Sequence, residues 1–153
     1  MKVLVQRVKE ASCTVDGEVI SSIKDGFLLL VGFTHSDTIE DVHYMAKKIS
    51  NLRIFEDENH RMNKSIQDMD YEILSISQFT LYGDSRKGNR PSFIAAMKPN
   101  KAEHLYLQLS IILNKVYGIN TVNGAFGKTM DIGLVNSGPV TIELEKNDTK
   151  TNE

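Results

Sequence analysis

The first part of the chain alternates apolar and polar residues in short runs that are typical of β-strands. Residues 2–8 and 11–15 are predicted to be strands, and Asp16-Gly17 follows them directly. Because both residues of this dipeptide tolerate a positive φ angle, they favour a tight hairpin turn, with residues 18–23 returning as the partner strand. The continuous apolar run over 26–33 predicts a central strand that is buried on both faces.

Two later segments repeat their apolar residues with helical spacing. The first follows Asp37, which we expect to be its N-cap because Glu40 stands three residues later. The second follows Pro99, with Asn100 as the expected N-cap and Gly118 as the residue that ends it. The expected apolar faces consist of Ile39, Val42, Met45, Ala46, Ile49 and Leu52, and of Ala102, Leu105, Leu109, Ile112 and Val116.

The remaining segments predict loops and three more strands. The segment 53–70 is polar and turn-rich, and its residues 57–60 are expected to form an exposed hairpin loop. Residues 71–81 predict a strong strand, while 130–134 and 140–144 alternate as two closing strands. A mixed α/β chain of this kind fits a mostly antiparallel sheet curled into a barrel, with two main helices packed outside.

Length and composition indicate one globular domain. The 153 residues suit a single domain over 1–145, and we expect the polar tail 146–153 to be disordered. Net charge is −2, so any contact with nucleic acid must come from a local patch. The single cysteine, Cys13, is expected to pack in the core and excludes an intrachain disulfide. The early charges near Met1 and the lack of a 20-residue apolar run predict a cytoplasmic protein.

Several kinds of chemistry have no support in the sequence. The four histidines, His35, His43, His60 and His104, lack metal-ligand spacing, so no zinc site is expected. There is no P-loop, no dinucleotide fingerprint and no nucleophile-elbow string. A Ser-His-Asp triad stays open, because triads are recognised by geometry and not by spacing.

Two short segments are the best candidates for a functional site. Residues 77–84 (SQFTLYGD) follow a strand-like run, and residues 136–141 (NSGPVT) contain a Gly-Pro pair. Ser77, Gln78 and Thr80 offer hydroxyl and amide groups beside backbone N–H groups, which can hold an ester carbonyl and stabilise an oxyanion. A polar strand end and an ordinary turn are the plainer interpretations of the two strings.

Together the two strings resemble the signature motifs of the D-aminoacyl-tRNA deacylases, which hydrolyse mischarged tRNA. The resemblance runs from Val3 to about Leu144, with departures at Gly83 and Ser137, where the family often has Ala and Asp. It implies the barrel fold of that family and a homodimer. It also implies an enzyme without cofactor or metal that cleaves the ester between tRNA and a D-amino acid, or glycine.

The resemblance also implies roles for individual residues. Ser77, Gln78, Phe79 and Thr80 match the catalytic motif, in which the tRNA 2′-hydroxyl is taken to assist the attack. Thr80 is expected to bind and not to act as nucleophile, because no base stands beside it in the sequence.

The Gly-Pro pair has a separate implied role. In the family the bond corresponding to Gly138-Pro139 is cis, and the pair enters the partner's active site, where its carbonyls reject L-amino acids. Arg7 and Asn136 are expected to support that turn.

Residues for tRNA binding follow from the same resemblance. The basic cluster Arg86, Lys87 and Arg90 is expected to meet phosphates of the acceptor end, although a solvated loop is the plainer interpretation. Phe126 and, more weakly, Ala102 match positions near the terminal adenine.

Two other functions remain open at this point. One is a binding module of the same fold that grips the acceptor end of tRNA without catalysis. The other is a hydrolase of small D-amino acid esters that ignores RNA.

Overall fold

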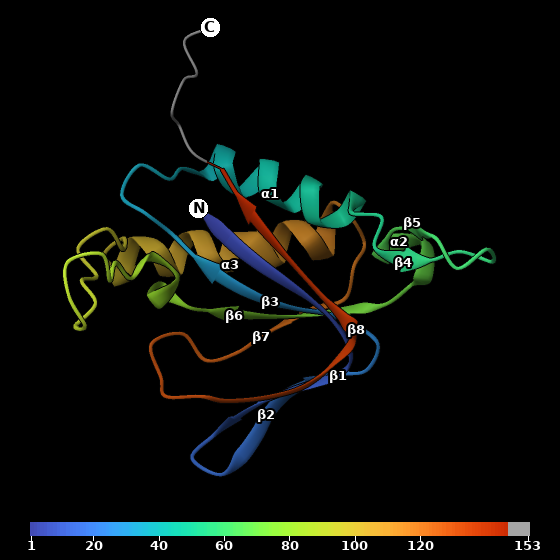
Figure 1. Cartoon of the computed structure of the whole chain (residues 1–153), viewed down its shortest axis with the longest axis horizontal. Coiled ribbons are helices and arrows are strands. Elements are labelled where there is room, and N and C mark those ends of the chain that lie inside the picture. The colour runs from blue at the N-terminus through green and yellow to red at the C-terminus, as the bar shows by residue number, and fades with distance from the viewer. Residues whose placement is uncertain (147–153) are drawn as a thin grey trace, which may run out of the picture.

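The computed structural model describes residues 1–146 of the chain (Figure 1). Of the tail expected to be disordered, Lys146 is described, and residues 147–153 lie outside the described part.

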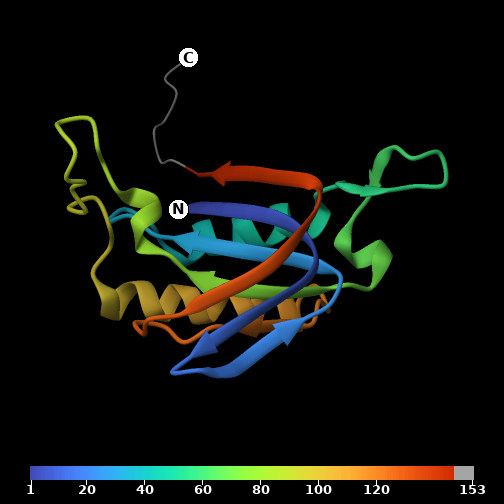
Figure 2. The ribbon, with the colours of Figure 1, turned by 60° about the horizontal axis from the view of Figure 1, so that its bottom comes forward.

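One large sheet organises the molecule. Its strands are β1 (Lys2–Val15), β2 (Glu18–Ile23), β3 (Gly26–Gly32), β6 (Glu72–Ser77), β7 (Thr121–Asn123) and β8 (Asp131–Glu145). Their order is β2-β1-β3-β6-β7, and β8 pairs with β1. Figure 2 shows β1 and β8 curving together, so that the sheet wraps toward a barrel as the sequence predicts.

The direction of the strands decides where a site can form. β1 is antiparallel to β2, β3 and β8, whereas β3, β6 and β7 run parallel to one another. The alternation pattern did not predict β7 or the parallel pairs. Parallel strands bring their carboxyl ends to one edge, which is the place where sheets of this kind bind ligands.

Two long helices, α1 (Ile39–Asn51) and α3 (Pro99–Lys115), lie over one face of the sheet, and α2 (Ile66–Met69) is a single turn (Figure 1). The core between the helices and the sheet includes Phe27, Leu29, Val42, Met45, Ile49, Tyr106 and Leu109. A second cluster on the other side of the sheet holds Leu28, Leu74, Ile76 and the fully buried Cys13, as expected for that thiol.

The turn chemistry of the first hairpin is confirmed. Asp16 and Gly17 both have positive φ, at 50° and 79°. The short strands β4 (Phe55–Glu56) and β5 (Met62–Lys64) pair around an exposed loop at 57–60, also as expected.

Both expected helix caps were wrong. Thr38 caps α1, and its N–H donates to the Asp41 carboxylate at 2.8 Å. Lys98 stands at the N-cap of α3, with Pro99 at the first helical position. Proline is well suited to that position because its fixed φ matches the helix and no N–H is needed there.

Several expected strands also differ, and residues 2–8 and 11–15 form one continuous strand, β1, instead of two. The strand predicted over 71–81 ends at Ser77, and residues Phe79–Tyr82 form a 3₁₀ turn. The two closing strands are one long strand, β8, whose pairing with β1 is irregular between Gln6 and Glu10.

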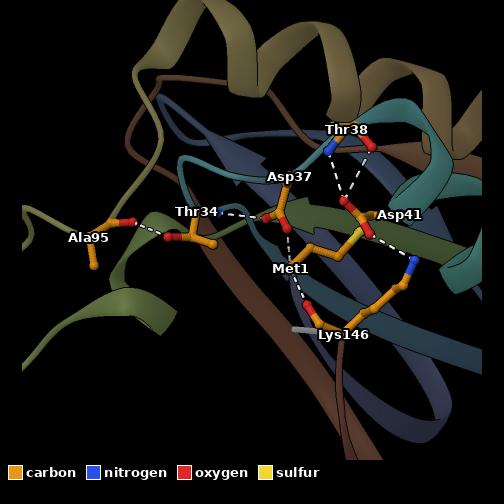
Figure 3. Close-up of polar contacts among 7 residues, drawn as sticks. All are labelled: Met1, Thr34, Asp37, Thr38, Asp41, Ala95 and Lys146. Carbon is orange, nitrogen blue, oxygen red and sulfur yellow. Dashed lines mark hydrogen bonds and ion pairs between the residues drawn. The ribbon is translucent and has the colours of Figure 1, made fainter. Parts of the chain in front are cut away.

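Asp37 fails to cap α1 because its carboxylate is already occupied (Figure 3). One oxygen binds the buried amine of Met1 at 2.7 Å, and the other accepts the Thr34 N–H at 2.7 Å. The Thr34 hydroxyl donates to the Ala95 carbonyl at 2.6 Å. These contacts tie the start of β1 to the segment that leads into α3. Loss of one partner of such a buried ion pair costs about 3–5 kcal/mol.

Candidate active site

A cleft of about 700 Å³ lies where β3 and β6 end. Its floor comes from Val31–Phe33 and from Ile76–Thr80. One wall is the segment from Phe93 to Ala102, at the start of α3, and the other is the loop from Phe126 to Ile132, which follows β7. The cleft therefore occupies the edge that the parallel strands define.

The first sequence motif lies inside this cleft. Ser77, Gln78, Phe79 and Thr80 all line it. The Gln78 N–H donates to the Val31 carbonyl at 2.7 Å, which extends the pairing of β6 with β3 by one residue. The chain then turns into the 3₁₀ helix instead of continuing as a strand.

Hydrogen-bond donors gather at this turn. The Gln78 side-chain amide donates to the Thr80 hydroxyl at 2.8 Å. The first hydrogen bond of the turn runs from the Leu81 N–H to the Gln78 carbonyl, so the N–H groups of Phe79 and Thr80 precede it. The first N–H groups of a helical turn have no partner within the turn. Phe79 and Thr80, which carry these N–H groups, both line the cleft.

The structure also brings Phe126 and Ala102 to the cleft, one on each wall. Phe126 packs against Tyr106 with ring centroids 5.7 Å apart, and the Tyr106 hydroxyl donates to the Ser75 carbonyl at 2.5 Å. Burial raises the pKa of Tyr106, so this hydroxyl keeps its proton and its hydrogen bond. Tyr106 thereby fixes the position of Phe126.

Phe93, on the first wall of the cleft, was not predicted as a site residue. Its ring packs edge-on against Phe79, with centroids 5.2 Å apart. A Cβ added at Gly83 would lie 2.9 Å from Phe93 Cε1, so the glycine at this departure from the family pattern leaves room for the ring. No spacing signal in the sequence marks Phe93, because only the fold brings it next to Phe79.

The expected basic cluster is not part of the cleft. Arg86, Lys87 and Arg90 are absent from its lining. Arg86 forms hydrogen bonds of 2.9 and 2.8 Å with the two carboxylate oxygens of Asp84. The guanidinium holds the pKa of Asp84 down at about 2. The cations that do line the cleft, Lys98 and Lys128, were not predicted.

Part of the second motif, residues 137–140, projects from the ladder between β8 and β1. Gln6 pairs with Thr141 and Val8 pairs with Asn136, so residues 137–140 oppose Arg7 alone. The Gly138-Pro139 bond is cis, and both residues are exposed. Neither lines the cleft of its own chain.

Two side chains hold this projecting segment, as the sequence predicts. Arg7 donates to the Ser137 carbonyl at 2.9 Å and to the Ile54 carbonyl at 2.7 Å. The Asn136 amide donates to the Val140 carbonyl at 3.1 Å and accepts the Val140 N–H at 2.7 Å. The segment is thus braced at both ends while its tip faces solvent.

Within residues 1–146, no three His, Cys, Asp or Glu side chains come together in a way that could hold a metal ion. Over the same residues, no helix is long and apolar enough to cross a membrane. The donors in the cleft are hydroxyl, amide and backbone N–H groups, which suit the carbonyl of an ester. Together with the ammonium groups of Lys98 and Lys128, these donors fit the class of hydrolases that act on carbonyl esters.

Comparisons with known proteins give the family. The sequence model of the family described as D-Tyr-tRNA(Tyr) deacylase matches residues 4–145. A D-aminoacyl-tRNA deacylase of Exiguobacterium sibiricum is 56% identical over 95% of this chain and 100% of its own. One from Bacillus mycoides is 55% identical over 95% of this chain and 99% of its own. The chain belongs to this family of deacylases, which are hydrolases.

Solved structures agree on the fold. A protein described as the c-Myc DNA unwinding element binding protein matches with a TM-score of 0.91 and 46% identity, over 96% of this chain and 99% of its own. A probable eukaryotic D-amino acid tRNA deacylase matches with a TM-score of 0.80 at 15% identity, over 94% and 97% of the two chains.

Proposed function

We propose that this family member hydrolyses the ester of D-aminoacyl-tRNA in the cytoplasm, in the cleft at the ends of β3 and β6. The observation that carries the proposal is the 3₁₀ turn after Ser77, whose first residues, Phe79 and Thr80, line the cleft and have N–H groups without a partner within the turn. An oxyanion that forms on the ester carbonyl would accept hydrogen bonds from these groups. Such preorganised donors often contribute about 3–4 kcal/mol each to transition-state stabilisation.

The attack on the ester is assigned to water, with assistance from the substrate. The hydroxyl of Thr80 has the Gln78 side-chain amide as its partner, and that N–H group donates and cannot accept the hydroxyl proton. Thr80 therefore lacks the adjacent base that would make it a nucleophile. The 2′-hydroxyl of the terminal ribose stands next to the ester and is the group that we assign to activating the water. Ser77, Gln78, Phe79 and Thr80 then bind and orient the ester.

The working unit that we propose is a homodimer in which each Gly138-Pro139 tip enters the partner's cleft. The support is that both residues are exposed, braced from behind and absent from their own chain's cleft. Backbone carbonyls at the tip would meet the amino group of the substrate and leave no space for an L side chain. Glycine has no side chain, so glycyl-tRNA would pass the same filter.

Deacylation of matched D- and L-tyrosyl-tRNA by the purified protein, with a metal chelator present, tests this proposal. Rapid release from the D form alone is the expected result. Release from both forms would contradict the chiral filter, and loss of activity on adding the chelator would contradict the proposed chemistry.

A second candidate is a protein that binds nucleic acid without turnover. It is favoured by the 46% identical structure, which is described as binding a DNA element. Tight binding of uncharged tRNA with no release of D-tyrosine, in the same assay, would select this candidate. Release from D-tyrosyl-adenosine lacking the 2′-hydroxyl, at the rate seen with the intact ester, would instead indicate a hydrolase of small esters.

A further inference from the structure

The charges of the cleft are all of one sign. Lys98 stands on the wall that leads into α3, and Lys128 stands on the opposite wall, in the loop after β7. As far as the structure describes the chain, the other lining residues are uncharged and mostly apolar, and no Asp or Glu is among them. The whole chain has a net charge of −2, so two cations without a carboxylate form a local exception.

Both lysines lack an acidic partner. In the described part of the chain, neither Lys98 nor Lys128 forms an ion pair. Arg86, by contrast, already binds both carboxylate oxygens of Asp84. Both lysines are exposed, and the mostly apolar lining between them strengthens their attraction for a bound anion by reducing the water around it.

We propose that Lys98 and Lys128 bind the phosphate that joins the terminal adenosine to the preceding nucleotide of tRNA. This inference rests on the proposed function, in which the ester lies at Ser77–Thr80 and the adenine lies near Phe126. The terminal 5′-phosphate is the nearest negative charge on such a substrate, and it must enter or border the same cleft. A phosphodiester loses solvation there and needs cationic partners in exchange. The two walls supply one each.

The role differs from that expected for Arg86, Lys87 and Arg90. A contact with the terminal phosphate positions the reacting ester, whereas cations outside the cleft can reach only nucleotides further along the strand. Phosphate contacts fix register without reading sequence. The lysine pair would therefore act on every tRNA that shares the same 3′ end.

Binding of two small probes tests the inference without turnover. The probes are adenosine and adenosine 5′-methylphosphate, which differ by one phosphodiester charge. We expect the phosphodiester to bind more tightly to the unaltered protein. Lys98→Gln and Lys128→Gln should each reduce that advantage by about three- to tenfold, as expected for a partly exposed charge contact, and leave adenosine binding unchanged. Lys101→Gln, one turn into α3 and outside the cleft lining, is the matched control.

The salt dependence of deacylation gives a second readout. Each phosphate neutralised on a single strand contributes a slope of about −0.7 to a plot of log affinity against log salt. Because the two lysines share one phosphate, the double variant should remove about that amount and each single variant a part of it. The effect should appear in KM more than in kcat. An equal phosphodiester advantage in all four proteins would overturn the inference. Failure of the unaltered protein to release D-tyrosine would instead overturn the proposed function, and the probe binding would still decide the role of the lysines.

Discussion

The turn after Ser77 and the segment 137–140 are held in different ways. The turn is continuous with β6, lies against β3 through the Gln78 N–H, and forms the floor of a cleft. The segment leaves the ladder between β1 and β8 and is braced by Arg7 and Asn136, with an exposed tip. One region lines a cavity, and the other projects from the sheet. The difference is what the proposed dimer requires, in which the tip of one chain completes the cleft of another.

The largest effect should come from the projecting tip. Gly138 has a φ of +134°, and a Cβ there would lie 2.8 Å from Val140 Cγ2 and 3.0 Å from Arg7 Nη2. Gly138→Ala should therefore displace the tip and lower kcat/KM for D-aminoacyl-tRNA by more than about a hundredfold, since small misplacements are costly in catalysis. Ser137→Ala, on the same segment, should cost less than about threefold. Kinetics on D-tyrosyl-tRNA measures both.

The tip variant should leave the other region intact. Binding of adenosine 5′-methylphosphate to Gly138→Ala should match that of the unaltered protein, because the probe lacks the aminoacyl group that the tip is proposed to meet and Gly138 does not line the cleft of its own chain. Loss of probe binding together with activity would show that the substitution acts by disturbing the fold.

A smaller effect is expected at the floor of the cleft. Thr80→Val removes the hydroxyl that accepts from Gln78, and it should lower kcat by about ten- to a hundredfold if that hydroxyl only positions groups. Single-turnover rates give the measurement. A loss of about 10⁴-fold or more, comparable to removal of a nucleophile, would contradict the assignment. Thr129→Val, on the wall of the same cleft, is the control.

Loss of Arg7, which holds the segment 137–140, should have a smaller effect than a change at Gly138 itself. Arg7→Gln loses hydrogen bonds to the Ser137 and Ile54 carbonyls, and one charged hydrogen bond is worth about 1.5–3 kcal/mol. We expect kcat/KM to fall by about tenfold, with unchanged binding of the small probe to the cleft. The exposed Lys9→Gln is the matched control on the same strand. Equal losses in turnover and probe binding would place the action of Arg7 in the cleft instead.

The smallest effect concerns the loop that the sequence suggested for tRNA. Arg86 lowers the pKa of Asp84 to about 2, so the pair stabilises the fold above the unfolded-state pKa, near 4. That contribution is lost as the pH falls through about 2. Melting temperatures of the unaltered protein and of Asp84→Asn should differ slightly at pH 7 and converge in acid. A difference that grows below pH 4 would contradict this account.

Turns and helix faces depend on residues close together in the sequence, so the sequence alone predicts them well. The Asp16-Gly17 hairpin follows from turn chemistry, and most of the buried faces of α1 and α3 follow from helical periodicity. The exceptions are Ile39 and Val116, which were expected on those faces and are exposed. Asp37 looked like a cap because nothing local reveals that the Met1 amine, 36 residues away, binds its carboxylate. Residues 78–81 continue an apolar strand pattern, and only their position at the end of β6 turns them into a 3₁₀ helix.

The residues of the cleft show the same difference between a contiguous motif and residues that only the fold brings together. The sequence marks the four residues from Ser77 to Thr80 because they are contiguous and match a motif, and the structure places all four in the lining of the cleft. Phe93, Lys98 and Lys128 come from segments that the parallel strands bring together, so no spacing in the sequence connects them. The sequence does not show that Arg86 pairs with Asp84 or that it lies outside the cleft lining, and its expected contact with tRNA stays a prediction.

The central claim is that the cleft of one chain works with the Gly-Pro tip of another. Subunit mixing tests it most directly. A cleft variant, Gln78→Ala combined with Thr80→Val, and the tip variant Gly138→Ala are unfolded and refolded together, and deacylation of D-tyrosyl-tRNA is measured. Half of the dimers would be mixed, and each would carry one site with an intact cleft and an intact tip, so about a quarter of the unaltered activity should return. Activity no higher than the mean of the two variants refolded separately would contradict the claim.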